Sequence, residues 1–321
     1  MRILVTGANG QVGSALLSSL GALGSVVPVT RADLDLSFAA SIEPTLNRLN
    51  PDLLINPAAY TAVDRAEDEP DLAHLINAEA PGVMARWAAA RGVPFVHFST
   101  DYVFDGSGER PWCERDSARP LSVYGASKFA GEEFVRAANG PHLIVRTSWV
   151  YTVEGRNFLR TIARLAAERD ELRIVSDQIG APTSARTIAD SITQMLAAGH
   201  SDLARSFDGA DRLVHLAAAG ETSWHGFATA IVDGLRTRGA RLKVSAIVPI
   251  ATQDYPTKAR RPRNSRLSLE RLQRSFGIDT PDWNEALDAE LDQLALNFLS
   301  AAGSDSNEAW PHARPTDFSM G

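Results

Sequence analysis

The chain has 321 residues, of which 44% are hydrophobic and 22% are charged, a composition typical of one large or two moderate globular domains. Its net charge of -7 argues against a nucleic-acid partner, and its single cysteine, Cys113, excludes an intrachain disulfide. No apolar run reaches the length of about 18 residues that crosses a membrane, so the sequence predicts a cytoplasmic protein without a membrane segment.

The first predicted element is a strand that leads through a glycine-rich turn into a helix. Residues 2–6 form a short apolar run typical of a buried parallel strand, and residues 14–20 have apolar side chains at helical spacing. Between them, Gly7 permits a tight turn, Gly10 lets the backbone approach a phosphate, and Gly13 allows helix and strand to pack closely. The segment predicts a dinucleotide site at the helix N-terminus, although a glycine turn without a ligand is the alternative.

The second predicted strand, residues 25–30, should end near the adenosine ribose of a dinucleotide. NAD-binding proteins commonly place an acidic residue there, but this chain has Arg31, with Asp33 and Asp35 shortly after it. A guanidinium suits a 2′-phosphate, so Arg31 favours NADPH and leaves the use of NADH open. A solvated loop arginine is the alternative interpretation.

Strands and helices alternate through the first half of the chain. Further strands are expected at residues 52–56, 95–99 and 142–147, and helices at 70–91 and 122–138. This alternation predicts an α/β fold, a Rossmann-type doubly wound parallel sheet with helices on both faces.

The second half of the chain predicts a smaller, partly interleaved substrate domain. Residues 1–150 are expected to form the dinucleotide-binding domain and residues 151–300 mainly the substrate-binding domain. Segments near 172–195 and 213–217 should return to the first domain. Residues 301–321 are rich in Ser, Asp, Asn and Pro and predict a flexible tail.

Four segments follow predicted parallel strands. In a doubly wound sheet, ligands bind beyond the carboxyl ends of the strands, so these segments should meet in space. They are Gly7–Gly13, Ala58–Thr61, Ser99–Tyr102 and Thr147–Trp149.

Tyr124 and Lys128 lie four residues apart in the helix after the third of these segments, so their side chains should share a face. A nearby ammonium stabilises phenolate, so Lys128 is expected to lower the pKa of Tyr124 from about 10. Thr100 and Tyr124 could hydrogen-bond a substrate carbonyl, and Tyr124 could protonate the alkoxide that a hydride produces there. Alternatively, Thr100 caps a loop and Lys128 is solvated.

Seven motifs extend this pattern beyond a shared nucleotide fold. They are Thr6–Gly13, Thr61–Glu67, Ser99–Gly106, Pro120–Lys128, Arg146–Tyr151, Asp177–Thr183 and Arg261–Leu267. With them the chain resembles the extended short-chain dehydrogenase/reductases, and within these the dTDP-4-dehydrorhamnose reductases, from residue 1 to about residue 295.

The resemblance implies that NAD(P)H reduces the 4-keto group of dTDP-4-dehydro-L-rhamnose to give dTDP-L-rhamnose, a sugar nucleotide for cell-wall or surface polysaccharide. It implies the catalytic residues Thr100, Tyr124 and Lys128. The implied cofactor contacts are Gly10, Gln11, Val12, Asp35, Leu36, Ala59, Tyr60, Thr61, Tyr124 and Lys128, to which Gly7, Gly13 and Arg31 are added from the residue pattern. The implied contacts of the sugar-nucleotide substrate are Val63, Thr100, Asp101, Tyr102 and Trp149.

Trp149, Arg261 and Arg263 each have more than one interpretation. Trp149 could pack in the core instead of contacting the substrate. Arg261 and Arg263 could attract the substrate diphosphate or lie in a solvated turn. Asn264 is expected to cap a helix over residues 265–274.

The resemblance also raises the question of a metal. Some relatives form dimers bridged by magnesium that glutamates hold, one of them early in the first helix. This chain has Ala15 there and Arg186 in a second candidate region, so no bridging metal is predicted. A monomer and a homodimer both stay open.

Other functions compatible with the motifs keep the same fold. One is reduction of another nucleotide-linked 4-keto-6-deoxy sugar, because sequence does not fix the contacts that read hydroxyl groups. Another is a non-catalytic regulatory subunit, which the intact Thr100, Tyr124 and Lys128 argue against. An epimerase or dehydratase is the third; a dehydratase would be expected to carry Glu after Asp101, where this chain has Tyr102.

Overall fold

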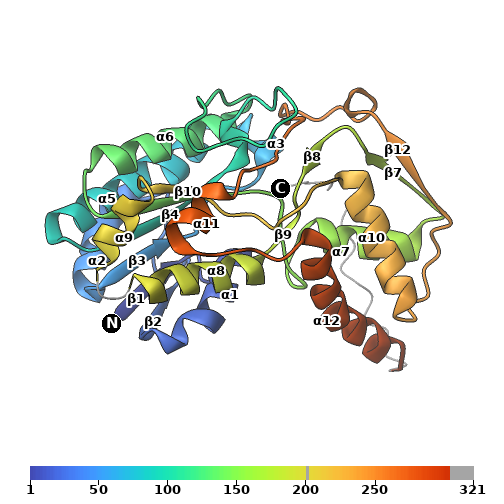
Figure 1. Ribbon diagram of the computed structural model, residues 1–321, viewed down its shortest axis with the longest axis horizontal. Helices are drawn as coiled ribbons and strands as arrows, with labels where there is room; N and C mark the ends of the chain where they lie inside the picture. The colour runs from blue at the N-terminus through green and yellow to red at the C-terminus, as the bar shows by residue number, and fades with distance from the viewer. Residues whose placement is uncertain (200–201, 304–321) are drawn as a thin grey trace.

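The computed structural model describes residues 1–199 and 202–303, which form a central sheet with helices on both faces and a second group of elements beside it (Figure 1). Within these residues the central sheet has six strands in the order β10-β5-β4-β3-β1-β2, and every neighbouring pair is parallel. The strands are β1 (Arg2–Thr6), β2 (Ser25–Val29), β3 (Leu53–Asn56), β4 (Phe95–Thr100), β5 (His142–Thr147) and β10 (Leu213–His215).

Alternate residues of each strand point to opposite faces of the sheet, and each face has its own layer of helices. Ile3 and Val5 pack with Leu16 on one face, whereas Leu4 packs with Ile42 on the other. The first face is covered by α1 (Gln11–Ser19) and α8 (Ala185–Ala198), and the second by α2 (Ile42–Leu49), α5 (Ala80–Arg91) and α6 (Val123–Ala137). The predicted doubly wound parallel sheet is confirmed.

The helical run expected over residues 70–91 contains a change of geometry. It consists of α4 (Pro70–His74), a π-helical stretch η3 (Leu75–Glu79) and α5, which ends at Gly92 with φ +65°. A left-handed glycine is a common helix end because glycine adopts positive φ without a steric penalty. The π-helical stretch was not predicted, and it lies beside the candidate site.

A second hydrophobic core lies on the other side of the molecule (Figure 1). It is formed by α7 (Phe158–Glu168), α10 (Trp224–Thr237), α12 (Trp283–Gly303) and the parallel pair of β7 (Glu171–Val175) with β12 (Ala246–Ile250). The expectation that the strand near residue 172 returns to the first domain is therefore wrong, because its partner is β12. In contrast, α8 packs on the central sheet and β10 pairs with β5. The domain limits themselves stay a prediction.

The remaining described elements are short. They are α3 (Val63–Ala66), α9 (Leu203–Gly209), α11 (Glu270–Phe276), the 3-10 turns η1 (Leu20–Ala22), η2 (Ala39–Ser41), η4 (Asp101–Val103) and η5 (Thr252–Asp254), and the strands β6 (Val150–Tyr151), β8 (Ile179–Gly180), β9 (Thr183–Ser184) and β11 (Thr222–Ser223). Because α12 reaches Gly303, the first three residues of the expected tail are helical. Residues 304–321 lie outside the described part.

Candidate active site

The glycine turn after β1 has the shape that a pyrophosphate site requires. Gly7 has φ +55°, and a Cβ at Gly13 would lie 2.1 Å from the Gly7 carbonyl oxygen, so no larger residue fits there. Gly10 begins α1 without a side-chain cap, and the buried Gln11 Oε1 has no hydrogen-bond partner in the described residues. The exposed backbone N–H groups of this helix end are suited to an anionic ligand. The turn therefore fits a dinucleotide.

The predicted adenosine side lies in the loop after β2. Arg31 has a 78% exposed side chain, and its Nε lies 3.4 Å from Asp35 Oδ2. Hydrogen bonds from Ser37 lower the pKa of Asp35, so this carboxylate is charged at neutral pH. Leu36 is buried beside it. The Arg31 guanidinium thus keeps most of its surface open to a ligand.

The Ala59–Thr61 loop after β3 is held by Asn77, a residue that the sequence analysis missed. Asn77 is fully buried in the π-helical stretch, where its Oδ1 accepts from Tyr60 N at 2.8 Å. Its Nδ2 donates to Tyr60 O and to Ser127 Oγ, both at 3.0 Å. One amide thereby ties the loop to α6, one residue before Lys128. The only signal in the sequence was an Asn within a mostly apolar helical stretch.

Thr100 and Tyr124 meet at the carboxyl end of β4. The Thr100 hydroxyl donates to Asp101 Oδ1 at 3.1 Å and accepts from Tyr102 N at 3.2 Å, so this residue also caps η4. The Tyr102 and Tyr124 rings lie edge to face with centroids 5.5 Å apart. Burial raises the pKa of Tyr124 above its usual value, and its contact with the Thr100 side chain lowers it only in part. The phenol therefore stays protonated.

Lys128 is not arranged as the sequence analysis expected. It is 2% exposed, which rules out a solvated side chain, and its Nζ donates to Phe98 O at 2.6 Å. Burial lowers the pKa of Lys128 to about 8, and the charge of Glu132 opposes this shift. The ammonium is held against the end of β4, and burial places the pKa of Tyr124 above its usual value, so the net lowering expected from the spacing is not found.

The predicted sugar side has a buried carboxyl and a stacked aromatic pair. Asp101 is 2% exposed, and burial raises its pKa to about 6. Trp149 has φ +49°, a conformation that costs energy for a residue with a side chain, and its ring stacks on Trp224 at 3.6 Å. The alternative of core packing is thus partly correct for Trp149. Val63, at the beginning of α3, is also buried.

The last motif reaches back to the first half of the chain. Arg261 Nη2 lies 2.6 Å from Asp64 Oδ2 and its side chain is 2% exposed, so this guanidinium is not open to a diphosphate from solvent. Arg263 is 73% exposed and stays a candidate. Asn264 does not cap a helix, since α11 begins only at Glu270; its Nδ2 donates to Arg110 O at 2.8 Å instead.

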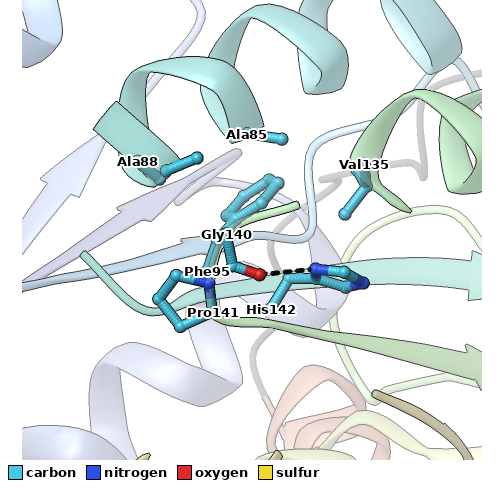
Figure 2. A pocket seen from close by; sticks show the side chains of 8 residues that line it. Ala85, Ala88, Phe95, Val135, Gly140, Pro141 and His142 are labelled. Carbon is cyan, nitrogen blue, oxygen red and sulfur yellow. Dashed lines mark hydrogen bonds between the residues drawn. The ribbon is translucent and has the colours of Figure 1, made fainter. Parts of the chain in front are cut away.

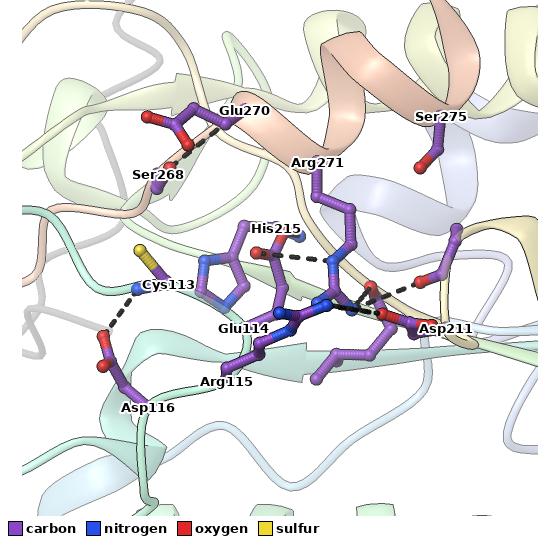
Figure 3. A network of polar contacts seen from close by, with 12 residues as sticks. Cys113, Glu114, Arg115, Asp116, Asp211, His215, Ser268, Glu270, Arg271 and Ser275 are labelled. Atoms are coloured by element: carbon purple, nitrogen blue, oxygen red, sulfur yellow. Dashed lines mark hydrogen bonds and ion pairs between the residues drawn. The ribbon is translucent and has the colours of Figure 1, made fainter.

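A small pocket and a network of charged side chains lie away from the carboxyl ends of the strands. The pocket borders Phe95 and His142, the first residues of β4 and β5 (Figure 2). It therefore lies at the amino ends of these strands, away from the candidate site. A network around Arg271 joins it to Asp211 at 3.3 Å and to Glu114 at 3.7 Å (Figure 3). This network ties α11 to the loop before α6 and is structural.

Known proteins resemble this chain over most of its length. The family model described as RmlD substrate binding domain matches residues 1–296. A dTDP-4-dehydrorhamnose reductase of Burkholderia thailandensis is 49% identical over 289 residues, covering 89% of this chain and 97% of that protein.

The chain belongs to the family described as RmlD substrate binding domain.

Two solved dTDP-4-dehydrorhamnose reductases of the family share the fold. The Clostridium acetobutylicum structure has a TM-score of 0.82 and 37% identity and covers 92% of this chain and 99% of its own. The Bacillus anthracis structure, a complex with NADP, has a TM-score of 0.82 and 33% identity, covering 91% and 99%. A Thermus thermophilus UDP-glucose 4-epimerase complex with NAD, at 17% identity and a TM-score of 0.73, shares the fold alone.

Two features bear on metals and membranes. Arg186 lies in the second region considered for a bridging metal, and its Nε is 3.1 Å from Oε1 of Glu290, a nearly buried carboxylate. Among the described residues, no three His, Cys, Asp or Glu side chains are grouped to hold a metal ion. Within residues 1–199 and 202–303, every helix is too short or too polar to span a bilayer.

Proposed function

We propose that this chain reduces the 4-keto group of dTDP-4-dehydro-L-rhamnose with NADPH and gives dTDP-L-rhamnose. The observation that carries the proposal is that Thr100, Tyr124 and Lys128 all lie at the carboxyl end of β4, in the same sheet as the glycine turn after β1. The names of relatives at up to 49% identity supply the substrate. The same chemistry on another nucleotide-linked 4-keto-6-deoxy sugar is the alternative that substrate comparison tests.

The residues around the glycine turn fit the cofactor. The pyrophosphate would lie against Gly7, Gly10, Gln11, Val12 and Gly13. Side chains at Gly7 and Gly13 would clash with neighbouring backbone atoms, and the N-terminus of α1 has no side-chain cap. The adenosine side would be bound by Arg31, Asp35 and Leu36, and the nicotinamide side by Ala59, Tyr60, Thr61, Tyr124 and Lys128. NADPH supplies the hydride when it is bound, and a relative in this family was solved with NADP.

Thr100 and Tyr124 would hold the carbonyl oxygen of the substrate. The buried phenol of Tyr124 is protonated at neutral pH, so it can donate its proton to this oxygen as negative charge develops there. The phenolate left on Tyr124 then regains a proton from solvent. General acid catalysis of this kind contributes about 10²- to 10⁴-fold in rate.

Val63, Asp101, Tyr102 and Trp149 would contact the sugar nucleotide, together with Thr100. Trp149 is the residue with a strained backbone, and strain of this kind is concentrated at functional sites. Its ring is held by stacking on Trp224, and an aromatic ring suits contact with a sugar or a base.

Turnover of enzymatically prepared dTDP-4-dehydro-L-rhamnose tests the proposal directly. We expect one NADPH consumed for each dTDP-L-rhamnose formed, and slower consumption with other nucleotide-linked 4-keto sugars. A folded protein that binds NADPH but does not consume it with this substrate would reject the proposal. Equal rates with NADH would reject the selectivity attributed to Arg31.

A further inference from the structure

Glu132 is a buried carboxylate in the middle of the candidate catalytic helix. It lies one helical turn after Lys128, and its relative exposure is 0%. A charged side chain at such a position is costly unless several donors surround it. Its neighbours therefore indicate what it does.

The donors to Glu132 come from three elements. Its Oε1 accepts from Ser99 Oγ at 2.6 Å and from Arg146 Nε at 2.7 Å. Its Oε2 accepts from Arg146 Nη2 at 2.6 Å and from Arg136 Nη2 at 3.0 Å. The hydrogen bonds from Arg146 lower the pKa of Glu132 in spite of burial, so the group stays ionised.

Two of these donors, Ser99 and Arg146, come shortly before residues of the site in the chain. Ser99 precedes Thr100 at the end of β4, and Arg146 lies three residues before Trp149 at the end of β5. Glu132 itself belongs to α6, which carries Tyr124 and Lys128. A single carboxylate thus fixes the helix to the two strand ends that the proposed reaction uses.

We propose that Glu132 is a positioning residue, which holds α6 on the ends of β4 and β5 and keeps the Lys128 ammonium charged for binding the cofactor. The inference rests on the proposed role of Lys128. It assigns a function to a residue outside the Tyr-x-x-x-Lys motif.

The surroundings of Lys128 support an effect of charge. Burial lowers the pKa of Lys128 to about 8, and Glu132 is the charged group that opposes burial. The charge of Lys128 helps to lower the pKa of buried His97 in β4, so His97 stays neutral and adds no positive charge. The ionisable residues on the elements packed against α6 are Asp64, Arg65, Asp71, His74, Glu79, Arg86, Arg91, His97, Asp101, Tyr102, His142 and Arg146.

The test compares Glu132→Gln with Glu133→Gln. The second variant is a matched control because Glu133 is the next residue, has a 55% exposed side chain and also pairs with Arg136. NADPH affinity is measured by direct binding from pH 6.5 to 9.5, and thermal unfolding checks the fold. In the wild type and in Glu133→Gln, affinity should fall as the pH rises through about 8.

In Glu132→Gln the same fall should occur about one pH unit lower, since a close opposite charge shifts a pKa by that order. Unchanged pH dependence in Glu132→Gln, even with reduced stability, would show a purely structural role and overturn the inference. Equal shifts in both variants would also overturn it.

Arg136→Gln covers the case in which Glu132→Gln does not fold. Its side chain is 35% exposed, and its removal leaves the Arg146 pair intact while removing positive charge near Glu132. Because Arg146 still pairs with Glu132 in this variant, the fall in affinity should occur at the wild-type pH or above it, and a fall at lower pH would contradict the inference. Because binding needs no sugar nucleotide, a wild type that binds NADPH without turnover would reject only the proposed substrate.

Discussion

The indole rings of Trp149 and Trp224 lie face to face, with centroids 3.6 Å apart and planes 10° from parallel. Trp149 ends the segment after β5, whereas Trp224 begins α10 in the second core. The ring that we assign to the substrate is therefore set by a residue 75 positions later in the chain.

Gly180→Ala tests whether the position of the Trp149 ring matters for the reaction. A Cβ at Gly180 would lie 2.7 Å from Trp149 Cε2, so the indole must move. We expect kcat/KM to fall on the order of 10- to 100-fold, since small displacements in a site are costly. The stacked rings should give a circular dichroism signal that weakens in parallel. Gly21→Ala, where a Cβ meets nothing within 4 Å, is the control.

Tyr124→Phe tests the proton donor. Turnover should fall by about 10²- to 10⁴-fold while NADPH affinity is kept, because only the hydroxyl is removed. Tyr151→Phe is the control, as the Tyr151 hydroxyl is buried in the second core without a hydrogen-bond partner in the described residues. Steady-state kinetics and direct binding measure both quantities. A near-normal rate in Tyr124→Phe would remove this residue from the mechanism.

Breaking the Asp64–Arg261 pair should have unequal effects on stability. The guanidinium is 2% exposed but the carboxylate 32%, so only the carboxylate can be rehydrated when its partner is lost. Asp64→Ala should lower the free energy of unfolding by about 3–5 kcal/mol, and Arg261→Met by less. Urea unfolding measures both. The exposed Lys258–Asp68 pair provides a control, for which we expect about 0–1 kcal/mol.

Buried histidines should make the protein less stable in mild acid. Burial lowers the pKa of His97 and His215 well below 6.5, so below this pH the unfolded chain binds protons that the native state does not. Stability is then fully present above about pH 6.5 and falls as the pH decreases, by up to about 1.4 kcal/mol per pH unit for each histidine.

Urea unfolding between pH 7.5 and 6 measures this slope, to which Lys128, with a pKa of about 8, adds with the same sign near pH 7.5. Burial raises the pKa of Asp101 to about 6, so below that pH the native state takes up a proton there. Asp101 therefore makes the protein more stable as the pH falls, which is opposite to the effect of the histidines. His215→Gln should reduce the slope of stability against pH. An unchanged slope in this variant would contradict the assignment to His215.

The parts of the site that depend on local pattern could be predicted from the sequence. The glycine turn, the strand ends at Thr100 and Trp149 and the helix with Tyr124 each follow from short-range spacing. Asn77 and Glu132 could not be predicted, because their partners lie elsewhere in the chain. Asn77 bonds to Ser127, 50 residues away, and Glu132 to Ser99, 33 residues away.

The predictions for Lys128 and β7 failed for the same reason. A four-residue spacing places Tyr124 and Lys128 on one face but does not reveal that Lys128 is buried against the Phe98 carbonyl. Likewise, the apolar run of β7 predicts a strand without specifying its partner, which is β12. Burial and strand pairing depend on the whole chain.

The position of β10 has a consequence for how the protein folds during synthesis. β5 pairs with β10 through Ile144 and Leu213, so the strand that covers this edge is made about 70 residues later. Until then, a growing chain presents the unpaired hydrogen-bonding groups of β5, which can join the strand of another molecule. A fragment that ends near residue 150 would keep this edge exposed and should aggregate.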